Sequence, residues 1–292
     1  MKRMRLSFLL IFLSQHFFSL AAKVDSIDIP SAVMLKTYKA AIILPDSYAK
    51  NKLAYPVMYL LHGGGGHFSD WLTSTPDKMA VKNLADQYNI IIVLPEGQPF
   101  SWYLNSTIDK ESQFETYITA EVISTIDHTY RTVANKNGRV ITGLSMGGHG
   151  ALYLSTRHPE LFCAAGSMSG ALDLNVSNWK ISPEFLAGVK QRFQKLIGDT
   201  NNIAVYDAYS VVNMAEKIKA NKLPLVIDCG VDDFLVEPNR ELHRRLVYNH
   251  TPHDYTERPG GHTWPYWQNS LPSHVLFFDA IFKKNGVAVT AR

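Results

Sequence analysis

The chain of 292 residues is 46% hydrophobic and 19% charged, which are ordinary values for a globular protein. This composition excludes a disordered chain, a collagen-like repeat and a small disulfide-dense domain. The formal net charge is +3, but removing Lys2, Arg3 and Arg5 from the 29 Lys and Arg leaves 26, which equals the 26 Asp and Glu. No block of like charge follows, so the charge pattern gives no sign of a nucleic-acid partner.

The N-terminal segment has the three parts of a secretory signal peptide. A basic start is followed by an almost wholly apolar stretch over residues 6–13 and by small residues at Ala21 and Ala22. We expect cleavage near Ala22, so that residues 1–22 are removed and residues 23–292 form one domain, secreted or periplasmic. A membrane anchor is the less favoured alternative, because polar residues interrupt the apolar stretch and no later run is long enough to span a bilayer.

After this segment the chain alternates patterns typical of strands and helices. The runs at 55–61 and 90–94 are apolar throughout, which is typical of central strands in a parallel sheet covered on both faces. An apolar residue at every fourth position from Phe114 to Tyr130 predicts a helix packed along one stripe. In chain order we expect strands at 34–44, 55–61, 90–94, 139–142, 162–167, 223–228 and 254–257, and helices at 114–130, 147–156, 239–247 and 273–282.

This alternation predicts a single α/β domain with a mostly parallel central sheet and helices on both faces. Residues 171–210 fit the alternation least well. We interpret them as an excursion over the edge of the sheet where the strands end, because ligands bind at that edge in such folds.

The motif Gly143-Leu144-Ser145-Met146-Gly147 lies between an expected strand and an expected helix. In that position it is typical of a nucleophile elbow, a strained turn that pushes the serine hydroxyl out of the sheet. Side chains two residues before and after the serine would collide with the turn, so glycine occupies both places. The turn also directs the N–H of Met146 at a developing oxyanion. We therefore predict that Ser145 is a nucleophile, the alternative being a plain strand-to-helix turn.

Four glycines, Gly63 to Gly66, follow His62 directly after an expected strand. Glycines leave backbone N–H groups unshielded, as an oxyanion hole requires. A phosphate-binding loop would need a Lys followed by Ser or Thr after the glycines, and the sequence has none there. We predict that this loop supplies the second oxyanion donor, the alternative being a flexible surface loop.

A serine nucleophile needs a base, and the base needs a carboxylate that orients it. In this type of fold the chain order is Ser, then Asp or Glu, then His. Asp232 and Asp233 follow one expected strand, and His262 follows the next in a Gly-rich turn. Of the eleven His residues, His262 alone stands after a strand at such a turn. We predict that it is the base and that one of the two Asp residues orients it.

Two pairs of His, His62 with His67 and His250 with His253, have a spacing that would suit metal ligands. No acidic residue or Cys clusters with either pair along the sequence. We therefore expect neither a metal nor another cofactor.

The two Cys residues, Cys163 and Cys229, are expected to be free thiols. Cys163 opens one expected strand, whereas Cys229 ends a strand that we place beside it. At about 3.3 Å per residue, opposite ends of such parallel strands lie well over ~10 Å apart. A disulfide needs Cα atoms within about 7 Å of each other.

Short motifs spread over residues 35–283 form a specific set. They are Leu60-Leu61-His62-Gly63-Gly64-Gly65-Gly66, Asp70-Trp71, Ser101-Trp102-Tyr103, Gly143-Leu144-Ser145-Met146-Gly147-Gly148, Ser167-Met168-Ser169-Gly170, Asp228-Cys229-Gly230 with Asp232-Asp233, and Gly260-Gly261-His262. Together they resemble the putative-esterase family of α/β-hydrolases. That family includes the feruloyl and acetyl-xylan esterases of carbohydrate esterase family 1, tributyrin esterases, S-formylglutathione hydrolases and the mycolyltransferases.

The resemblance implies an α/β-hydrolase fold in which Ser145 is the nucleophile, Asp233 the acid and His262 the base. It also implies that the N–H groups of Gly64 and Met146 form the oxyanion hole. The expected activity is that of a serine esterase. A secreted acyltransferase would use the same triad with a sugar or lipid hydroxyl in place of water. A non-catalytic binding protein on the same scaffold is the remaining alternative, although binding alone would not require all three side chains.

Aromatic residues flank the three expected catalytic loops in sequence. Their faces stack on sugar rings and on cinnamoyl groups, so we expect several to bind substrate, the alternative being that they are core residues. Charged groups are scarce around these loops, which argues against an acidic or glutathione-like substrate. With the family resemblance, the expected function is removal of feruloyl or acetyl groups from plant cell-wall polysaccharide such as xylan, the alternative being a general short-chain esterase of the tributyrin type. The expected substrate-binding residues are Trp71, Trp102, Tyr103, Trp264 and Trp267, with Tyr266 beside them.

Overall fold

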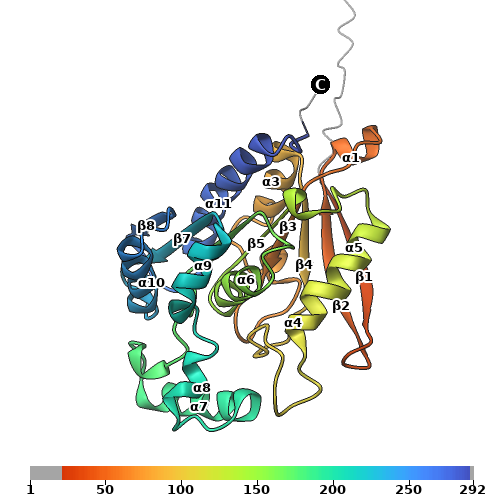
Figure 1. Ribbon diagram of the computed structural model, residues 1–292. Helices are drawn as coiled ribbons and strands as arrows, with labels where there is room; N and C mark the ends of the chain where they lie inside the picture. The colour runs from red at the N-terminus through yellow and green to blue at the C-terminus, as the bar shows by residue number, and fades with distance from the viewer. Residues whose placement is uncertain (1–21, 290–292) are drawn as a thin grey trace, which may run out of the picture.

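The computed structural model describes residues 22–289, which form an eight-stranded sheet with helices on both faces (Figure 1). The strand order is β1-β2-β4-β3-β5-β6-β7-β8. β1 and β2 are antiparallel at one edge, and the strands from β4 to β8 across the sheet are parallel. The strands are β1 (Lys23–Ser31), β2 (Lys36–Leu44), β3 (Val57–Leu61), β4 (Ile91–Pro95), β5 (Arg139–Gly143), β6 (Ala164–Met168), β7 (Leu225–Gly230) and β8 (Asp254–Arg258).

The mostly parallel sheet agrees with the prediction, and β3 and β4 are buried at every residue. β1 is a strand that the sequence pattern did not predict. It lies at the edge of the sheet and pairs with β2, and most of its residues are exposed or half-buried. Asp28 in β1 forms an ion pair with Lys39 of β2 at 2.8 Å. An edge strand of this kind lacks the continuous apolar run that identified β3 and β4.

Helices cover the two faces as separate layers. One face is packed against α3 and α11, through residues such as Leu84 and Phe278. The other is packed against η1, α6 and α10, through Ile118, Leu152 and Leu242. The α-helices are α1 (Ser47–Lys50), α2 (Asp70–Thr73), α3 (Ala80–Tyr88), α4 (Phe114–Thr116), α5 (Ile123–Thr129), α6 (Met146–Arg157), α7 (Pro183–Ile197), α8 (Ile203–Asp207), α9 (Ala215–Asn221), α10 (Val236–Tyr248) and α11 (Trp264–Lys284). Shorter turns are the π-helical η1 (Tyr117–Val122) and the 3-10 helices η2 (Lys136–Gly138), η3 (Val176–Asn178) and η4 (Val211–Met214).

The helix expected at 114–130 is present but has a wider middle section. It begins as α4, continues through the π-helical η1 and ends as α5. Its apolar residues recur every fourth position, whereas an α-helix has 3.6 residues per turn, so a strict α-helix would turn this stripe away from the sheet. The wider turn of η1 keeps Phe114, Ile118 and Val122 buried along one line.

The segment between β6 and β7 is the excursion that the sequence indicated. It holds η3, α7, α8, η4 and α9, and Figure 1 shows α7 and α8 beyond the end of the sheet that lies away from the C-terminus. α7 begins at a Ser182 cap, whose hydroxyl accepts the N–H of Phe185, and has Pro183 in its first turn. This Ser-Pro-Glu start is a helix signal that the strand-and-helix alternation did not use.

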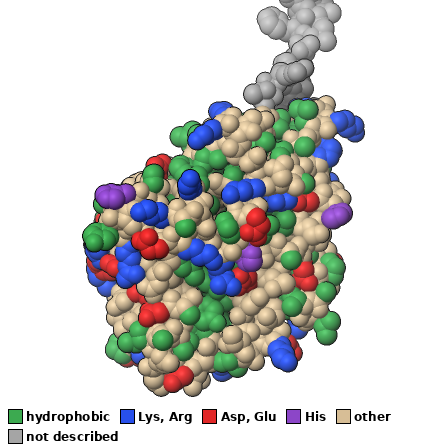
Figure 2. All heavy atoms as spheres, in the orientation of Figure 1, with side chains coloured by type: hydrophobic (Ala, Val, Ile, Leu, Met, Phe, Trp, Pro, Cys, Tyr) green, Lys and Arg blue, Asp and Glu red, His purple; other side chains and the backbone are tan. Residues whose placement is uncertain are grey.

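The surface carries charges of both signs, and the two thiols lie beneath it. Basic and acidic side chains are interspersed over the face shown in Figure 2. No helix within residues 22–289 is long and apolar enough to cross a membrane. The expected signal peptide lies outside the described residues apart from Ala22, whose backbone N–H donates to the Asp86 carboxylate at 2.8 Å. Cys163 and Cys229 are both buried and free, which confirms the prediction for the thiols.

Candidate active site

Ser145 occupies a strained turn between β5 and α6. Its φ is 55° and its ψ is −118°, a region that few residues other than glycine adopt. The flanking glycines make this turn fit: a Cβ on Gly143 would lie 2.7 Å from the carbonyl carbon of Gly147, and one on Gly147 would lie 2.6 Å from the backbone oxygen of His62. The N–H of Ser145 donates to the backbone oxygen of Met168 at 2.9 Å. The hydroxyl is therefore fixed at the end of β5, above the start of α6.

His262 connects Ser145 to Asp233. Its Nε2 lies 2.9 Å from the Ser145 hydroxyl oxygen, and its Nδ1 lies 2.9 and 3.0 Å from the two carboxylate oxygens of Asp233. An ionised carboxylate only accepts hydrogen bonds, so Nδ1 carries the proton and Nε2 is free to accept the serine proton. Asp233 is 1% exposed and also accepts the N–H of Leu235 at 2.8 Å, whereas Asp232 is exposed. The structure thus brings together Ser145, Asp233 and His262.

Two loops at the ends of β7 and β8 hold this arrangement. They pack backbone against backbone, because a Cβ on Gly230 would collide with the carbonyl of Gly260. The N–H of Asp232 donates to the Gly260 oxygen at 3.0 Å. The His262 ring packs against two aromatic side chains, with centroid distances of 4.5 Å to Phe234 and 4.8 Å to Trp267. The imidazole is therefore held by two aromatic contacts and by the hydrogen bond from Nδ1 to Asp233.

Two N–H groups of the glycine loop after β3, those of Gly63 and Gly64, have no hydrogen-bond acceptor among residues 22–289. Gly65 donates to the backbone oxygen of Pro99 at 2.5 Å, and Gly66 donates to that of Gly63 at 3.2 Å. The N–H of Met146, at the first position of α6, likewise has no acceptor in the described part of the chain. Unpaired N–H groups beside a nucleophile are what an oxyanion hole requires.

His62 and Glu96 support the glycine loop from below. In the neutral His62 ring, Nε2 accepts the N–H of Gly97 at 2.9 Å, and Nδ1 therefore donates to the backbone oxygen of Gly63 at 2.9 Å. The buried Glu96 accepts the N–H groups of Phe68 and Gln98, at 3.3 and 2.7 Å. Burial would raise the pKa of Glu96, but the hydrogen bonds that the carboxylate accepts, those from Phe68 and Gln98 among them, hold it below its ordinary value. Sequence reasoning missed Glu96, which directly follows the buried strand β4.

The sequence profile of the family described as Putative esterase matches residues 31–278. The chain belongs to the Putative esterase family. It is 31% identical over 243 residues to Esterase MT1326 of Mycobacterium tuberculosis, which covers 76% of this chain and 52% of that protein. The chain thus spans about half the length of that curated relative.

Two further relatives are similar over most of their length. An acetyl esterase of Caldicellulosiruptor saccharolyticus is 28% identical over 226 residues, which are 73% of this chain and 79% of that protein. The solved structure of a ferulic acid esterase superposes with a TM-score of 0.73 at 27% identity, covering 90% of this chain and 100% of the other. The family resemblance is confirmed, and the fold of this esterase-family chain is the α/β-hydrolase fold that the motifs implied.

A cavity of about 250 Å³ opens onto Ser145 in this esterase-family chain. The glycine loop and His262 form part of its wall, and the rest comes from Asp70, Leu144, Trp264 and Trp267. This volume suits a small acyl group, since pockets for drug-sized ligands are commonly 300–1,000 Å³. Asp70 and Leu144 also belong to this wall, and sequence reasoning had assigned no role to either side chain.

Only two of the five expected substrate-binding residues line this cavity, Trp264 and Trp267. Trp71 is 1% exposed and donates from its ring nitrogen to the backbone oxygen of Leu61 at 3.1 Å, with Trp264 packed on it. Trp71 therefore supports the cavity wall from behind and presents no face to it. The expectation that it contacts substrate directly does not agree with its burial.

Trp102 and Tyr103 also belong to the core, contrary to expectation. Trp102 packs on Phe193 of α7 at a centroid distance of 4.7 Å. Tyr103 is fully buried between Gly97 and Gly150, where any Cβ would overlap its ring, and its hydroxyl donates to the backbone oxygen of His62 at 3.1 Å. Tyr266, expected beside the other aromatic residues, is buried as well. Position next to a catalytic loop in sequence did not distinguish these core rings from exposed ones.

The two His pairs whose spacing would suit metal ligands do not form metal sites in the described part of the chain. His62 and His67 both lie 3.5 Å from Glu96, an acidic neighbour that the sequence had not indicated. Both ring nitrogens of His62 are nevertheless engaged with the backbone, as described above. His253 faces His243 at 2.8 Å, with no carboxylate completing a set. No group of three or more His, Cys, Asp or Glu that could hold a metal ion occurs in the described part of the chain.

Proposed function

We propose that this protein is a serine carboxylic-ester hydrolase. The observation that carries the proposal is the hydrogen-bonded series Ser145–His262–Asp233, at 2.9 Å on each side of the imidazole, next to unpaired backbone N–H groups. A nucleophile, an oriented base and oxyanion donors together are the parts that acyl transfer requires. Membership of the Putative esterase family supports the same activity.

In the proposed mechanism each group has one role. Ser145 attacks the ester carbonyl while His262 Nε2 accepts the hydroxyl proton, and Asp233 stabilises the imidazolium that results. The N–H groups of Gly64 and Met146 donate to the oxyanion. His262 then gives the proton to the leaving alcohol, and the acyl group remains on Ser145. Water, deprotonated by the same imidazole, attacks the acyl-enzyme and releases the acid.

For the substrate, we propose feruloyl or acetyl esters of plant cell-wall polysaccharide such as xylan. Trp264 and Trp267 line the small cavity at Ser145, and aromatic faces pack well on cinnamoyl and sugar rings. The relatives named acetyl esterase and ferulic acid esterase support this class of ester. We also propose that residues 1–22 are a signal peptide and that the mature chain is secreted or periplasmic.

The test is kcat/KM for methyl ferulate, acetylated xylan and a butyryl ester. We expect one of the two plant-type substrates to be preferred. A kcat/KM that is tenfold or more higher for the butyryl ester than for both plant-type substrates would refute the cell-wall proposal. The protein would then be a general short-chain esterase. Product analysis with an added acceptor alcohol gives the corresponding test of hydrolysis, because a dominant transfer product would identify an acyltransferase.

A further inference from the structure

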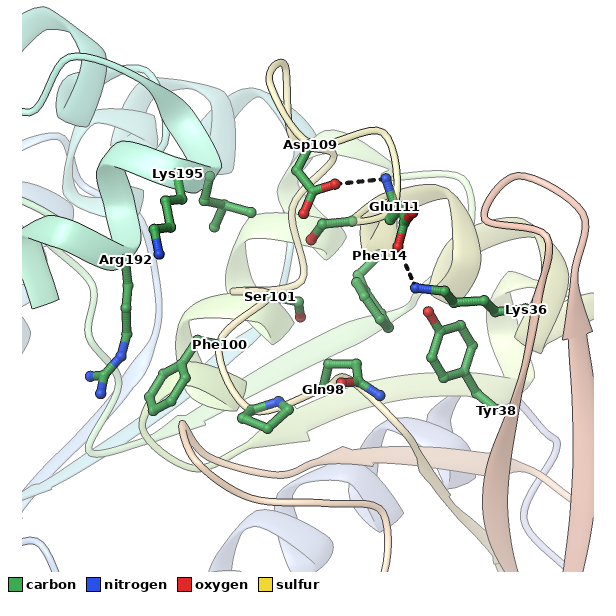
Figure 3. Close-up of a pocket in the computed structure, with 13 residues that line it drawn as sticks. Lys36, Tyr38, Gln98, Phe100, Ser101, Asp109, Glu111, Phe114, Arg192 and Lys195 are labelled. Atoms are coloured by element: carbon green, nitrogen blue, oxygen red, sulfur yellow. Dashed lines mark hydrogen bonds and ion pairs between the residues drawn. The ribbon is translucent and has the colours of Figure 1, made fainter.

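A second cavity lies beside the oxyanion loop and shares a wall with it. This cavity has a volume of about 390 Å³, and Pro99 and Phe100 line it (Figure 3). The same two residues contact the glycine loop, because Gly65 donates to the Pro99 oxygen and a Cβ on Gly64 would lie 3.4 Å from the Phe100 ring. One short segment therefore separates the second cavity from the proposed oxyanion hole.

The lining of this cavity combines aromatic rings with uncharged polar groups. Phe100 supplies an exposed ring beside the buried rings of Tyr38 and Phe114, and the exposed Gln98 supplies an amide group. Rings that pack on C–H faces, next to groups that exchange hydrogen bonds with hydroxyls, are the features that accommodate a sugar. The volume lies within the usual range for a small-molecule site.

Two cations from α7 reach the same cavity. The Arg192 guanidinium lies 4.0 Å from the centroid of the Phe100 ring, and Lys195 follows on the same helix face. Neither has an ion-pair partner among residues 22–289. An arginine stacked on an aromatic ring keeps its hydrogen-bonding edge available for a carboxylate. The pair is thus a ready site for one negative charge.

The acidic residues at this cavity are already engaged on its far side. Glu111 forms an ion pair with Lys36 at 2.6 Å. Asp109 accepts the backbone N–H of Glu111 at 2.9 Å, and Figure 3 shows both carboxylates away from Arg192. The charge available to a ligand at the α7 end is therefore positive.

We propose that this cavity is a subsite for a carboxylate-bearing sugar, such as a uronic acid, in the polysaccharide that carries the ester. The proposal rests on the proposed function and extends it. Acetyl and feruloyl groups carry no charge, so an anion recognised here belongs to the alcohol part of the substrate. Because the cavity lies beyond Phe100 from the glycine loop, the sugar it binds is a neighbour of the esterified one. The Arg192 and Lys195 side chains bind its carboxylate, and the exposed Phe100 ring packs on its face.

The test compares two acetylated xylo-oligosaccharides that differ only in a glucuronic acid branch. Wild type is expected to show a higher kcat/KM on the acidic one, chiefly through KM, and this preference should shrink as salt is raised. Arg192→Gln and Lys195→Gln should each reduce the ratio of acidic to neutral kcat/KM, and the double variant should reduce it by about tenfold. Lys190→Gln, on the same helix but outside the cavity, is the matched control and should keep the ratio.

A binding measurement separates this proposal from the proposed function. Calorimetry with the Ser145→Ala variant and a non-acetylated acidic oligosaccharide requires no turnover, so it tests the subsite even if no ester is hydrolysed. Binding that the Arg192→Gln and Lys195→Gln changes abolish supports the subsite. Equal affinity for acidic and neutral oligosaccharides overturns it. S-acetylglutathione is titrated in parallel. If the Arg192→Gln and Lys195→Gln changes weaken the binding of S-acetylglutathione but not that of the acidic oligosaccharide, the proposal is also overturned, because the cavity would then recognise the anion of a small thiol compound.

Discussion

Asp233 and His262 share two short contacts, with Nδ1 2.9 and 3.0 Å from the two carboxylate oxygens, whereas the adjacent Asp232 faces solvent. Asn at position 233 would present an N–H to the ring and favour the tautomer in which Nε2 carries the proton and cannot accept one. Asp233→Asn should therefore lower kcat by about 10⁴. Asp232→Asn should stay within a few-fold of wild type. Steady-state kinetics of both variants on one ester decide the matter, and a larger loss in Asp232→Asn would refute the assignment.

Ser145→Ala should remove activity without unfolding the protein. The hydroxyl is small and stands at the cavity surface, so its loss leaves no sizeable internal void. Loss of a triad member typically costs a factor of roughly 10⁴ to 10⁶ in kcat. A fluorophosphonate probe should label wild type at this residue and fail to label the variant, while circular dichroism shows the same fold. Labelling that persists in the variant would place the nucleophile elsewhere.

Glu96→Gln should show how much the ionised Glu96 carboxylate contributes to the stability of the fold, and how this contribution depends on pH. The pKa of Glu96 in the folded protein lies below its ordinary value of 4.5. Its ionised form therefore adds stability that is fully present above the unfolded pKa and is lost as pH falls through the folded pKa. At pH 7 the variant should have a free energy of unfolding about 1–2 kcal/mol lower than wild type. Urea titrations at pH 7 and in strong acid should show this difference vanish in acid, and a difference independent of pH would argue against a role for the charge.

Two glycine substitutions should change stability in opposite directions. A Cβ on Gly147 would lie within 2.7 Å of the backbone oxygens of both Leu61 and His62, so Gly147→Ala should destabilise the fold by about 1–3 kcal/mol or more. Gly188 lies inside α7, where an added Cβ would meet no neighbouring group within 4 Å, so Gly188→Ala should stabilise the fold by about 0.5–1 kcal/mol. Thermal melts of the two variants provide the comparison. Equal effects would contradict the packing described for the turn.

The two thiols should react only after unfolding. Burial raises the pKa of Cys163 to about 11 and raises that of Cys229 further, so neither forms a thiolate readily at neutral pH. Native protein should resist iodoacetamide. Denatured protein, with no reductant added, should gain the mass of two labels. An unlabelled denatured chain would instead indicate a disulfide and a different arrangement of β6 and β7.

The elements that could be predicted are those whose local backbone or burial restricts which residue types can occupy each position. Gly143 and Gly147 are needed because neighbouring backbone atoms leave no room for a Cβ, and β3 and β4 are buried on both faces. These constraints act within a few residues, so they appear directly as motifs and apolar runs. The positions of Ser145 and His262 followed from them, since both stand at strand ends.

What could not be predicted depends on contacts between distant parts of the chain. Trp71 and Trp264 both follow catalytic motifs, but only the fold decides that one is covered and the other lines the cavity. The same holds for Arg192, which reaches Phe100 from a helix that the alternation of strands and helices did not reveal. β1 escaped prediction for another reason, because an edge strand with one solvated face carries a weak apolar signal.

The placement of α7 between β6 and β7 puts the residues proposed to bind the sugar and the residues proposed to cleave the ester in different parts of the chain. Ser145, Asp233 and His262 stand at the ends of sheet strands, whereas Arg192 and Lys195 belong to the excursion that follows β6. The excursion leaves and re-enters the sheet at neighbouring parallel strands, so we expect its replacement to preserve the strand ends where Ser145, Asp233 and His262 lie. A chimaera with the excursion of another esterase should therefore keep its rate on a minimal acetyl ester and acquire the donor's preference among polysaccharides.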